Sequence, residues 1–413
     1  MTDAPAAPSM ADTLKPRDAK DVEDAVRFAV SNETALEVIG AGSKRGIGRP
    51  LQTDMTLDLS GLSGIVLYEP EELVLTAQAG TPLAVIEDAV RAANQELAFE
   101  PIDYAPLFGG EAGAGTIGGV IAANLSGPRR IRQGAARDHF LGAKGVTGRG
   151  ETVKTGGRVV KNVTGYDLCK LLAGSWGTLA ALTEVTIKVL PRAETEATVV
   201  VHGLDDRDAM RAMAAAMGSS FDVSGAAHLP DHIAAHFDGL PEEGASTCLR
   251  VEGFAVSVKH RRETLAALLA PFGRISFVEA ESSRALWRSI RDARPFAQGA
   301  SLKRPLWRIS TEPMRGADLA DLIPPSAQMF YDWAGGLVWV GMPVEDEPDA
   351  AAIRSAVASI GGHATLVRAP VAARAANDVF PPQDAGLAAL SKRVKESFDP
   401  KGVLNPGRMW AGA

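Results

Sequence analysis

The sequence predicts a protein of two mixed helix-and-sheet domains, an α+β fold, and three observations support this prediction. Helix and strand signals alternate from the N-terminal region to Pro191, and 17 of the 42 glycines fall between Gly109 and Gly177. After Pro191 glycine becomes much less frequent. The length of 413 residues agrees with two or three domains, and a content of 46% hydrophobic and 23% charged residues is typical of globular proteins.

The elements before and within the glycine-rich window follow one another closely. Asp18 is a candidate N-cap for a helix whose apolar positions run from Val22 to Val30 at i, i+3, i+4 spacing. Thr81 and Pro82 predict the start of a second helix, as the cap and the first helical residue. The predicted strands of this part cover residues 35–39, 55–59, 65–68, 73–77, 140–146 and 181–190.

The second half of the chain predicts an α+β domain, because strands and helices alternate there without a phosphate-loop signature. Its predicted helices cover residues 205–217 and 262–269, and its predicted strands cover 247–254 and 337–340. An amphipathic helix then starts near residue 385 and breaks at Asp399-Pro400. We expect a disordered tail over 1–13, a first domain over 14–192, a second domain over 193–384, and a C-terminal segment over 385–413 that packs back on the first domain.

Two glycine-bearing loops, Gly40–Arg45 and Gly113–Gly119, are candidate binding sites for a pyrophosphate. Backbone N–H groups in such loops bind oxyanions, and any side chain larger than hydrogen keeps the backbone away from the ligand. Neither loop has the GxGxxG or GxxxxGK[ST] pattern, so Rossmann and Walker sites have little support. Each loop taken alone is better explained as an ordinary turn.

Four motifs that follow one another along the chain make the assignment of the two loops more specific. They are Gly115–Gly119 (GTIGG), Lys161–Leu168 (KNVTGYDL), Gly174–Thr183 (GSWGTLAALT) and Phe398–Gly407 (FDPKGVLNPG). Together they resemble the FAD-binding PCMH-type domain of the vanillyl-alcohol-oxidase superfamily, in the branch that oxidises 2-hydroxy acids. The resemblance implies a two-lobed PCMH-type FAD-binding domain followed by an α+β FAD-linked-oxidase C-terminal domain.

Two departures from that branch narrow the resemblance. Trp176 stands where most of the branch has glutamate, and residues 193–413 lack the histidine-rich metal motif of the larger relatives. With Ser126–Arg130 (SGPRR) and Gly361–Pro370 (GGHATLVRAP), this combination resembles the E-subunit family of three-component bacterial glycolate oxidase. That family implies a larger FAD-binding subunit and an iron–sulfur subunit as partners, a small 2-hydroxy acid as substrate of the complex, and no resident metal.

The same resemblance implies which residues contact the FAD. The first loop contributes Gly40, Ala41, Gly42, Ser43, Lys44 and Arg45, and the second contributes Gly113, Gly115, Thr116, Ile117, Gly118 and Gly119. Further contacts come from Asn124, Ser126 and Gly134 on the path toward the ring, from Lys161, Asn162 and Gly177, and from Leu182 through its backbone at the adenine. We expect a larger side chain at Gly118 to abolish FAD retention more than it lowers the stability of the apo fold.

The cysteines predict a non-covalent flavin and no metal cluster in this chain. Family members often tether the flavin through a His or Cys in the first loop, and Gly40–Gly48 has neither. Cys169 and Cys248 are better explained as buried small hydrophobic residues than as redox groups. Two thiols cannot hold an iron–sulfur cluster, so a partner must relay the electrons.

Histidines and arginines supply the remaining candidates, and no catalytic residue can be named. His228, His232 and His236 have helical spacing for a zinc site, but Pro230 favours a helix that starts after His228. His363 is either a flavin-facing base or an ordinary histidine. The basic cluster is either a solvated surface, a partner-docking surface interleaved with aromatics, or a carboxylate site; it consists of Arg284, Arg288, Arg291, Arg294, Lys303, Arg304 and Arg308, with Trp287, Phe296 and Trp307. The basic run Arg129–Arg137 has the FAD phosphates as an added possibility.

Charge and hydropathy exclude other classes of function. A net charge of −7 argues against nucleic acid as a ligand, and no apolar run is long enough to span a bilayer. The start of the chain has no signal-peptide pattern, so we expect a cytoplasmic protein, free or held at the inner face of the membrane through its partners. Three functions remain: a redox subunit of a glycolate-oxidising complex, a self-sufficient FAD-dependent 2-hydroxy-acid dehydrogenase, and a flavin-carrying assembly subunit whose FAD does not turn over.

Overall fold

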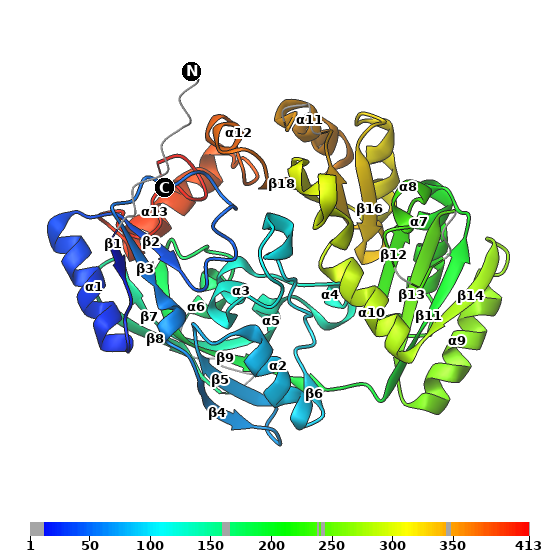
Figure 1. The fold of residues 1–413 in the computed structure, drawn as a ribbon, viewed down its shortest axis with the longest axis horizontal. Helices are drawn as coiled ribbons and strands as arrows, with labels where there is room; N and C mark the ends of the chain where they lie inside the picture. Colours follow the sequence, from blue (N-terminus) through cyan, green and yellow to red (C-terminus); the bar gives the residue numbers. More distant parts are fainter. Residues whose placement is uncertain (1–11, 159–165, 238, 241–243, 344–347, 413) are drawn as a thin grey trace.

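The computed structural model describes residues 12–158, 166–237, 239–240, 244–343 and 348–412. They form two lobes that lie side by side (Figure 1). The first lobe contains three small sheets and the N-terminal half of the chain, and the second contains one eight-stranded sheet. The C-terminal helix lies against the first lobe, so the second lobe is inserted between two parts of the first.

The first lobe is built from a parallel sheet, an antiparallel sheet and a two-stranded ladder. The parallel sheet has the order β1 (Asp12–Leu14), β3 (Met55–Asp58), β2 (Leu36–Ile39). The antiparallel sheet has the order β4 (Ile65–Glu69), β5 (Val74–Gln78), β9 (Ala180–Lys188), β7 (Phe140–Thr147), β8 (Thr152–Gly156), and β10 (Leu190–Pro191) pairs with β6 (Gln95–Glu96). Its helices are α1 (Ala19–Asn32), α2 (Leu83–Ala92), α3 (Ile117–Ala123), α4 (Arg130–Gln133), α5 (Ala136–His139), α6 (Leu168–Leu172) and the C-terminal α13 (Ala385–Phe398).

The second lobe is one antiparallel sheet with helices packed on it. The strand order is β14 (Arg274–Glu279), β11 (Thr195–His202), β13 (Ser246–Gly253), β12 (Gly225–Leu229), β16 (Gln328–Asp332), β17 (Leu337–Gly341), β15 (Leu306–Ser310), β18 (His363–Arg368). The helices are α7 (Asp206–Met217), α8 (Asp231–Ala234), α9 (Ala255–Leu269), α10 (Ala280–Arg291), α11 (Ala350–Ile360) and α12 (Val371–Ala376). No helix of the described ranges is long and apolar enough to cross a membrane.

The helix starts show where local sequence signals decide the structure. The Asp18 side chain accepts a hydrogen bond from the Asp21 backbone N–H at 2.9 Å, which confirms Asp18 as the N-cap of α1. The prediction for Thr81 is wrong, because its hydroxyl is used by the carbonyl of Gln78 at 2.7 Å and α2 begins after Pro82 without a side-chain cap. The α9 helix begins at Ala255, earlier than expected, because its N-cap position is Phe254 and provides no capping signal.

The C-terminal segment completes the first lobe. Val403 and Leu404 are buried in the small core that α1 forms with β2 and β3, and the Leu36 N–H donates to the Val403 carbonyl at 2.8 Å. The ammonium of Lys395, on α13, donates to the carbonyls of Thr178 and Leu404 at 2.7 and 2.8 Å. It also pairs with Asp399 at 2.6 Å. These contacts fix the chain that follows α13 beside β2.

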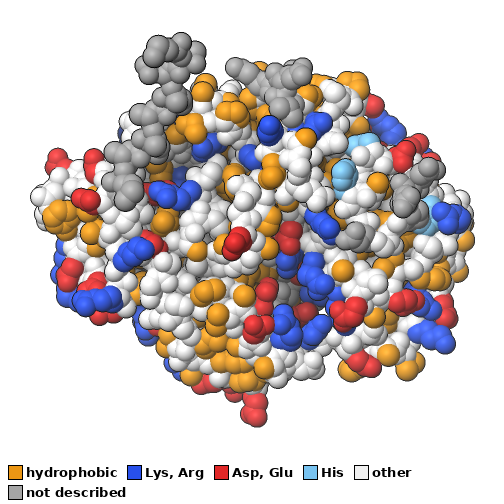
Figure 2. Space-filling view, in the orientation of Figure 1, with side chains coloured by type: hydrophobic (Ala, Val, Ile, Leu, Met, Phe, Trp, Pro, Cys, Tyr) orange, Lys and Arg blue, Asp and Glu red, His pale blue; other side chains and the backbone are white. Residues whose placement is uncertain are grey.

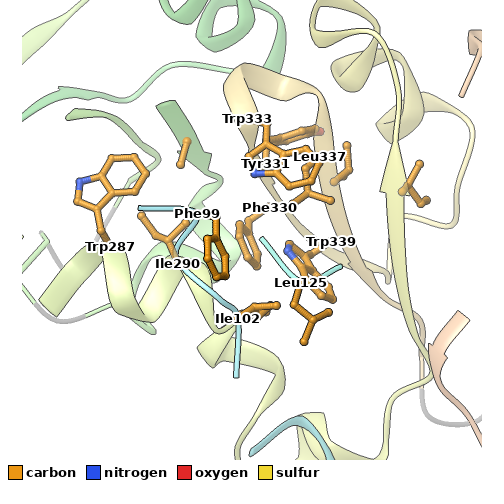
Figure 3. Close-up of a cluster of buried hydrophobic side chains, with 14 of the residues drawn as sticks. Phe99, Ile102, Leu125, Trp287, Ile290, Phe330, Tyr331, Trp333, Leu337 and Trp339 are labelled. Carbon is orange, nitrogen blue, oxygen red and sulfur yellow. The ribbon is translucent and has the colours of Figure 1, made fainter. Parts of the chain in front are cut away.

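An apolar core joins the two lobes. Phe99, Ile102 and Leu125 of the first lobe lie among aromatic side chains of the second lobe, including Phe330 and Trp339 (Figure 3). All five side chains are buried. Because one continuous core crosses the boundary, the lobes hold a defined relative position without a ligand.

Candidate cofactor site

The first lobe contains an open cavity of about 690 Å³ where the two glycine loops meet. The walls come from the end of β2 and the loop after it, from α3, from the start of β9, and from the C-terminal segment. The lining residues are Val38, Ile39, Gly40, Ala41, Gly42, Ser43, Lys44, Arg45, Leu59, Ala79, Thr116, Gly118, Gly119, Ala122, Ala123, Trp176, Gly177, Ala180, Leu182 and Arg408.

The loops approach each other so closely that glycine is required. A Cβ on Gly40 would collide with the hydroxyl of Thr116, and Gly42 has a φ of +74°, a conformation that side chains disfavour. Thr116 in turn caps α3, accepting a hydrogen bond from the Gly119 N–H at 3.4 Å. The glycines therefore bring two backbone segments together at the mouth of the cavity.

Two cations line this cavity without a carboxylate partner. The Lys44 ammonium contacts the Ser43 hydroxyl at 3.1 Å and forms no ion pair within the described ranges. Burial lowers its pKa to about 8. Arg408 is 5% exposed, its Nε has no hydrogen-bond partner, and burial lowers its pKa to about 10. A dianionic pyrophosphate supplies the counter-charge that both groups lack, so these residues fit such a ligand.

Arg45 differs from these two cations. Its guanidinium forms a two-pronged pair with Glu37, with Nε 2.9 Å from Oε1. This pair raises the pKa of Arg45, and the charge is already neutralised within the protein. Arg45 lines the cavity, but it provides less attraction for an anion than Lys44 or Arg408.

The structure brings many of the residues predicted from the sequence to this cavity, but not all of them. Those that line it are Gly40, Ala41, Gly42, Ser43, Lys44, Arg45, Thr116, Gly118, Gly119, Gly177 and Leu182. Gly113, Gly115 and Ile117 lie in or beside the second loop without lining the cavity. Lys161 and Asn162 lie outside the described residues.

Asn124, Ser126 and Gly134 lie beyond the cavity and shape the segment that follows α3. Asn124 has a left-handed φ of 51° and accepts a hydrogen bond from the Arg137 N–H at 2.9 Å. The Ser126 hydroxyl accepts from the Ala136 N–H at 2.9 Å. Gly134 has a φ of +84°. The hydrogen bonds of Asn124 and Ser126 are made to the protein's own backbone and stabilise this segment.

The expectation for Gly118 needs a correction. A Cβ at this position would lie 2.7 Å from the carbonyl oxygen of Ala79, while the Gly118 N–H donates to that same oxygen at 2.8 Å. A larger side chain there disrupts the packing of α3 on β5, so it destabilises the apo fold as well as the site. Gly119 is the neighbouring position whose Cβ would point toward Lys44, at 3.4 Å from its ammonium.

Sequence reasoning missed the contribution of the C-terminal segment to the cavity wall. Arg408 donates to the Lys44 carbonyl at 2.8 Å, and Asn405 bridges the Val38 N–H and the Trp176 carbonyl, each at 2.8 Å. Arg408 also lies over the Trp176 ring at 5.7 Å. Asn405 belongs to the VLNPG motif and Arg408 follows it, so the motif pointed to this segment but not to its contact with Lys44.

The basic cluster Arg284–Arg308 does not form the docking surface interleaved with aromatics that its sequence suggested. Trp287, Phe296 and Trp307 are buried, so they cannot form the core of an interface. Several arginines of the cluster have internal partners: Arg284 pairs with Glu281, and Arg291 with Asp292 at 2.8 Å. The cluster is therefore largely part of the protein's own packing.

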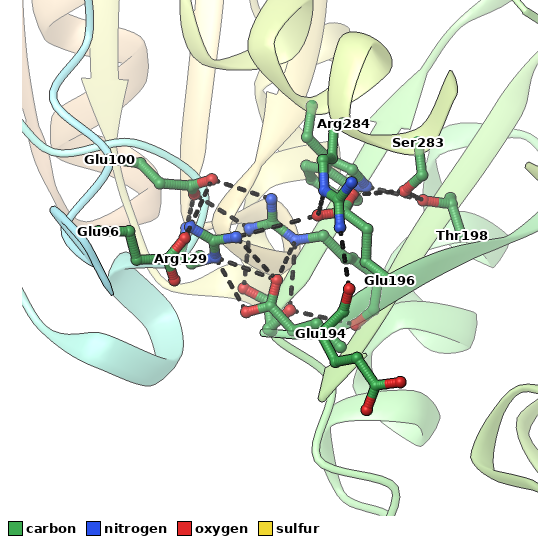
Figure 4. A network of polar contacts seen from close by, with 12 residues as sticks. Glu96, Glu100, Arg129, Glu194, Glu196, Thr198, Ser283 and Arg284 are labelled. Carbon is green, nitrogen blue, oxygen red and sulfur yellow. Dashed lines mark hydrogen bonds and ion pairs between the residues drawn. The ribbon is translucent and has the colours of Figure 1, made fainter. Parts of the chain in front are cut away.

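Arg129 belongs to an ionic network between the lobes (Figure 4) and does not line the cavity between the glycine loops. Its Nε lies 2.9 Å from Glu252, and Arg250 pairs with Glu100 at 2.9 Å. Burial alone would raise the pKa of Glu100, but Arg129 and Arg250 lower it to about 2. Charged side chains of both signs gather beside this junction, where a polar cavity of about 950 Å³ opens (Figure 2).

The histidine and cysteine candidates lie elsewhere. His228 is on β12, hydrogen-bonded to Thr247 at 2.9 Å, and α8 starts at Asp231, as predicted. The described part of the chain contains no group of three His, Cys, Asp or Glu side chains able to hold a metal. Cys169 and Cys248 are both buried and free, and burial raises the pKa of their thiols to about 11 and 12.

Comparisons with known proteins agree with this site. Residues 11–156 match the family model of an FAD binding domain. The chain is 37% identical over 387 residues to glycolate oxidase subunit GlcE of Escherichia coli, covering 94% of this chain and 95% of that one. It is 29% identical to glycolate oxidase subunit GlcD of Bacillus subtilis over 188 residues, 45% of this chain and 38% of that one. A solved structure of p-cresol methylhydroxylase has the same fold, with a TM-score of 0.71 at 14% identity, covering 96% of this chain and 88% of that one.

Proposed function

This chain belongs to the family of the glycolate oxidase subunit GlcE, and we propose that it is the FAD-binding subunit of a multi-subunit enzyme that oxidises glycolate to glyoxylate. FAD is its cofactor, as the match to an FAD binding domain indicates. The observation that carries the proposal is the cavity between the glycine loops, where Lys44 and Arg408 have no counter-ion within the described ranges.

The residues of the cavity have distinct tasks in this proposal. The Lys44 ammonium and the Arg408 guanidinium neutralise the FAD pyrophosphate, and the backbone N–H groups of both loops approach it. The backbone of Leu182 contacts the adenine. Bound FAD supplies the acceptor for the electron pair that leaves the substrate. Neither His nor Cys is among the described residues that line the cavity, which supports a flavin held non-covalently.

The route of the electrons requires partners. Conversion of glycolate to glyoxylate releases two electrons and two protons, and the electrons must travel onward. Cys169 and Cys248 lie in different lobes and are both buried, so this chain offers no thiolate set for an iron–sulfur cluster. An iron–sulfur subunit and a larger FAD-binding subunit complete the enzyme in this proposal.

We expect the isolated chain to oxidise glycolate poorly while the complex requires it. The histidine-rich metal motif that larger relatives carry does not occur in residues 193–413. A bound cation lowers the pKa of a substrate hydroxyl and stabilises the alkoxide from which hydride departs. Arginines alone bind substrate and transition state alike, which leaves the barrier unchanged.

Anaerobic mixing of the purified FAD-loaded chain with glycolate, D-lactate and D-2-hydroxyglutarate tests this dependence. We expect no flavin bleaching on the timescale of turnover. Bleaching at about 1 per second or faster would mean that the chain is a complete 2-hydroxy-acid dehydrogenase.

A second assay distinguishes a redox subunit from an assembly subunit. The complex is assembled with the wild-type chain and, in parallel, with a Lys44→Met chain stripped of FAD. We expect glycolate oxidation only in the first complex. Equal rates in both complexes would show that the flavin of this chain does not turn over.

A further inference from the structure

A second group of unpaired cations lies where the two lobes meet, outside the FAD cavity. Arg130, on α4 of the first lobe, and Arg308, on β15 of the second lobe, both lie over the ring of Trp333, at 4.6 and 4.8 Å from its centroid. The indole N–H of Trp333 donates to the Gly127 carbonyl at 3.0 Å, which ties the second lobe to the segment before α4.

A histidine completes this group. His363 begins β18, opposite Ser310, and Thr365 is opposite Arg308. Since alternate residues share a face of a strand, His363 is a diagonal neighbour of Arg308 on the same face of the sheet. Although His363 is exposed, desolvation lowers its pKa, and the positive charges of Arg308 and Arg130 lower it further.

No carboxylate of the described ranges forms an ion pair with Arg130 or Arg308. This is unusual for the lobe junction, where Arg129, Arg250 and Arg291 all have acidic partners. Of the nearby carboxylates, Asp138 accepts a hydrogen bond from the Ala135 N–H at 2.8 Å. Asp332 is buried and accepts a hydrogen bond from the Trp333 backbone N–H at 2.7 Å. Burial raises its pKa to about 7, so it provides only part of a counter-charge at neutral pH.

The backbone that presents Trp333 is strained. Trp333 and Ala334 have φ values of 53° and 57°, in the left-handed region that non-glycine residues disfavour. Such strain persists only where the surrounding structure enforces it, and it concentrates at binding and catalytic sites. Here the strained turn places an aromatic platform beneath two guanidinium groups from different lobes.

We propose that Arg130, Arg308 and His363, arranged around Trp333, form a binding site for the carboxylate of a small 2-hydroxy acid. Guanidinium groups match the planar geometry of a carboxylate, and both rest on the aromatic ring. Arg130 is exposed and Arg308 is half-buried. Arg308 also lies close enough to the buried Tyr104 to counteract part of the rise that burial causes in the pKa of its hydroxyl. The identity of the acid as glycolate rests on the proposed function, whereas the anion site does not.

The test is a calorimetric titration of the FAD-loaded full-length chain with glycolate and, in parallel, with oxalate, which cannot be oxidised. We expect Arg308→Gln and Arg130→Gln to raise the dissociation constant of both acids by about tenfold or more, and Arg308→Lys to restore part of the affinity. Arg132→Gln is the matched control, because Arg132 lies on the same helix as Arg130 but pairs with Asp222 at 2.6 Å. It should change the affinity by less than about twofold.

Flavin content and thermal melting of each variant establish that it is folded. The proposal is overturned if the wild-type chain binds neither acid up to about 10 mM, well above ordinary KM values. It is also overturned if the variants bind as the wild type does but no longer assemble with the partner subunits, since the cations then serve an acidic surface of a partner. Absence of glycolate oxidation by the assembled wild-type complex would contradict the proposed function alone and leave the anion site intact.

Discussion

The Arg408 guanidinium donates a hydrogen bond to the Lys44 carbonyl oxygen at 2.8 Å, although 364 residues separate the two positions. This contact joins the end of the chain to the first glycine loop and brings two cations to the same cavity. Because Arg408 is buried and Lys44 is partly buried, and neither has a counter-ion in the described ranges, the free protein carries an electrostatic cost there that an anionic ligand relieves.

Replacing Lys44 by methionine should affect the apo protein and FAD binding in opposite directions. Burial lowers the pKa of Lys44 to about 8, so the charged form destabilises the folded apo protein at neutral pH. Removing it should stabilise the apo fold by on the order of 1 kcal/mol and weaken FAD binding by roughly 10- to 100-fold. Thermal melts of the deflavinated chain and flavin-fluorescence titrations measure the two effects. A loss of both stability and affinity would assign Lys44 a structural role.

FAD affinity should fall as pH rises through about 8. A lysine with a lowered pKa is neutral in the free chain above that value, and binding the pyrophosphate then requires uptake of a proton. The affinity for FAD should then fall by close to tenfold per pH unit, until the pH reaches the pKa that Lys44 has in the FAD-bound chain. Arg408, with a pKa lowered to about 10, stays charged over this range. The dissociation constant of the Lys44→Met chain, measured over the same pH series, should stay constant. A rise parallel to that of the wild type would locate the titrating group elsewhere.

Two neighbouring glycines should respond differently to alanine. Gly119→Ala places a methyl group 3.4 Å from the Lys44 ammonium, so it should reduce FAD affinity while leaving the apo stability unchanged or slightly higher. Gly118→Ala places it 2.7 Å from the Ala79 carbonyl oxygen, which should destabilise the fold by about 1–3 kcal/mol. Chemical denaturation and FAD titration of both variants check this pair. Equal stability losses would refute the assignment of Gly119 to the cavity mouth.

The Lys395→Met chain should be less stable than the wild type and should release FAD more easily. The substitution removes an ammonium bound to two carbonyls and leaves the carboxyl of Asp399, which is fully buried, without its partner. Breaking a buried pair in this way costs about 3–5 kcal/mol. Lys392→Met on the same helix is the control, because its pair with Glu396 is exposed and should contribute less than about 1 kcal/mol. If the two variants had the same melting temperature, α13 would not anchor the cavity wall.

Local signals predicted much of the first lobe. The Asp18 cap, the β2 strand before the first glycine loop and the strand that starts at Phe140 all follow from patterns within a few residues. Both loops reach the same cavity, as the pyrophosphate interpretation required. The Thr81 prediction failed because a local contact, with the carbonyl of Gln78 three residues earlier, took the hydroxyl away from the helix start.

Contacts between distant parts of the chain could not be predicted in this way. The sequence pattern gives no indication that Arg408 lies against Lys44, or that Arg129 pairs with Glu252 of the second lobe. The basic cluster was interpreted as a surface because arginine and aromatic residues alternate there. Burial of Trp287 and Trp307 follows from their positions on α10 and β15, which a single sequence does not specify.

The flavin content of the purified chain tests the central claim most directly, namely that this cavity holds FAD without a covalent bond. The chain is precipitated with acid, and the flavin in the supernatant and in the pellet is measured against the protein. We predict one FAD per chain, all of it in the supernatant, and a loss of flavin from the chain in the Lys44→Met variant. Flavin that stays with the pellet, or a wild-type chain that binds none, would contradict the account.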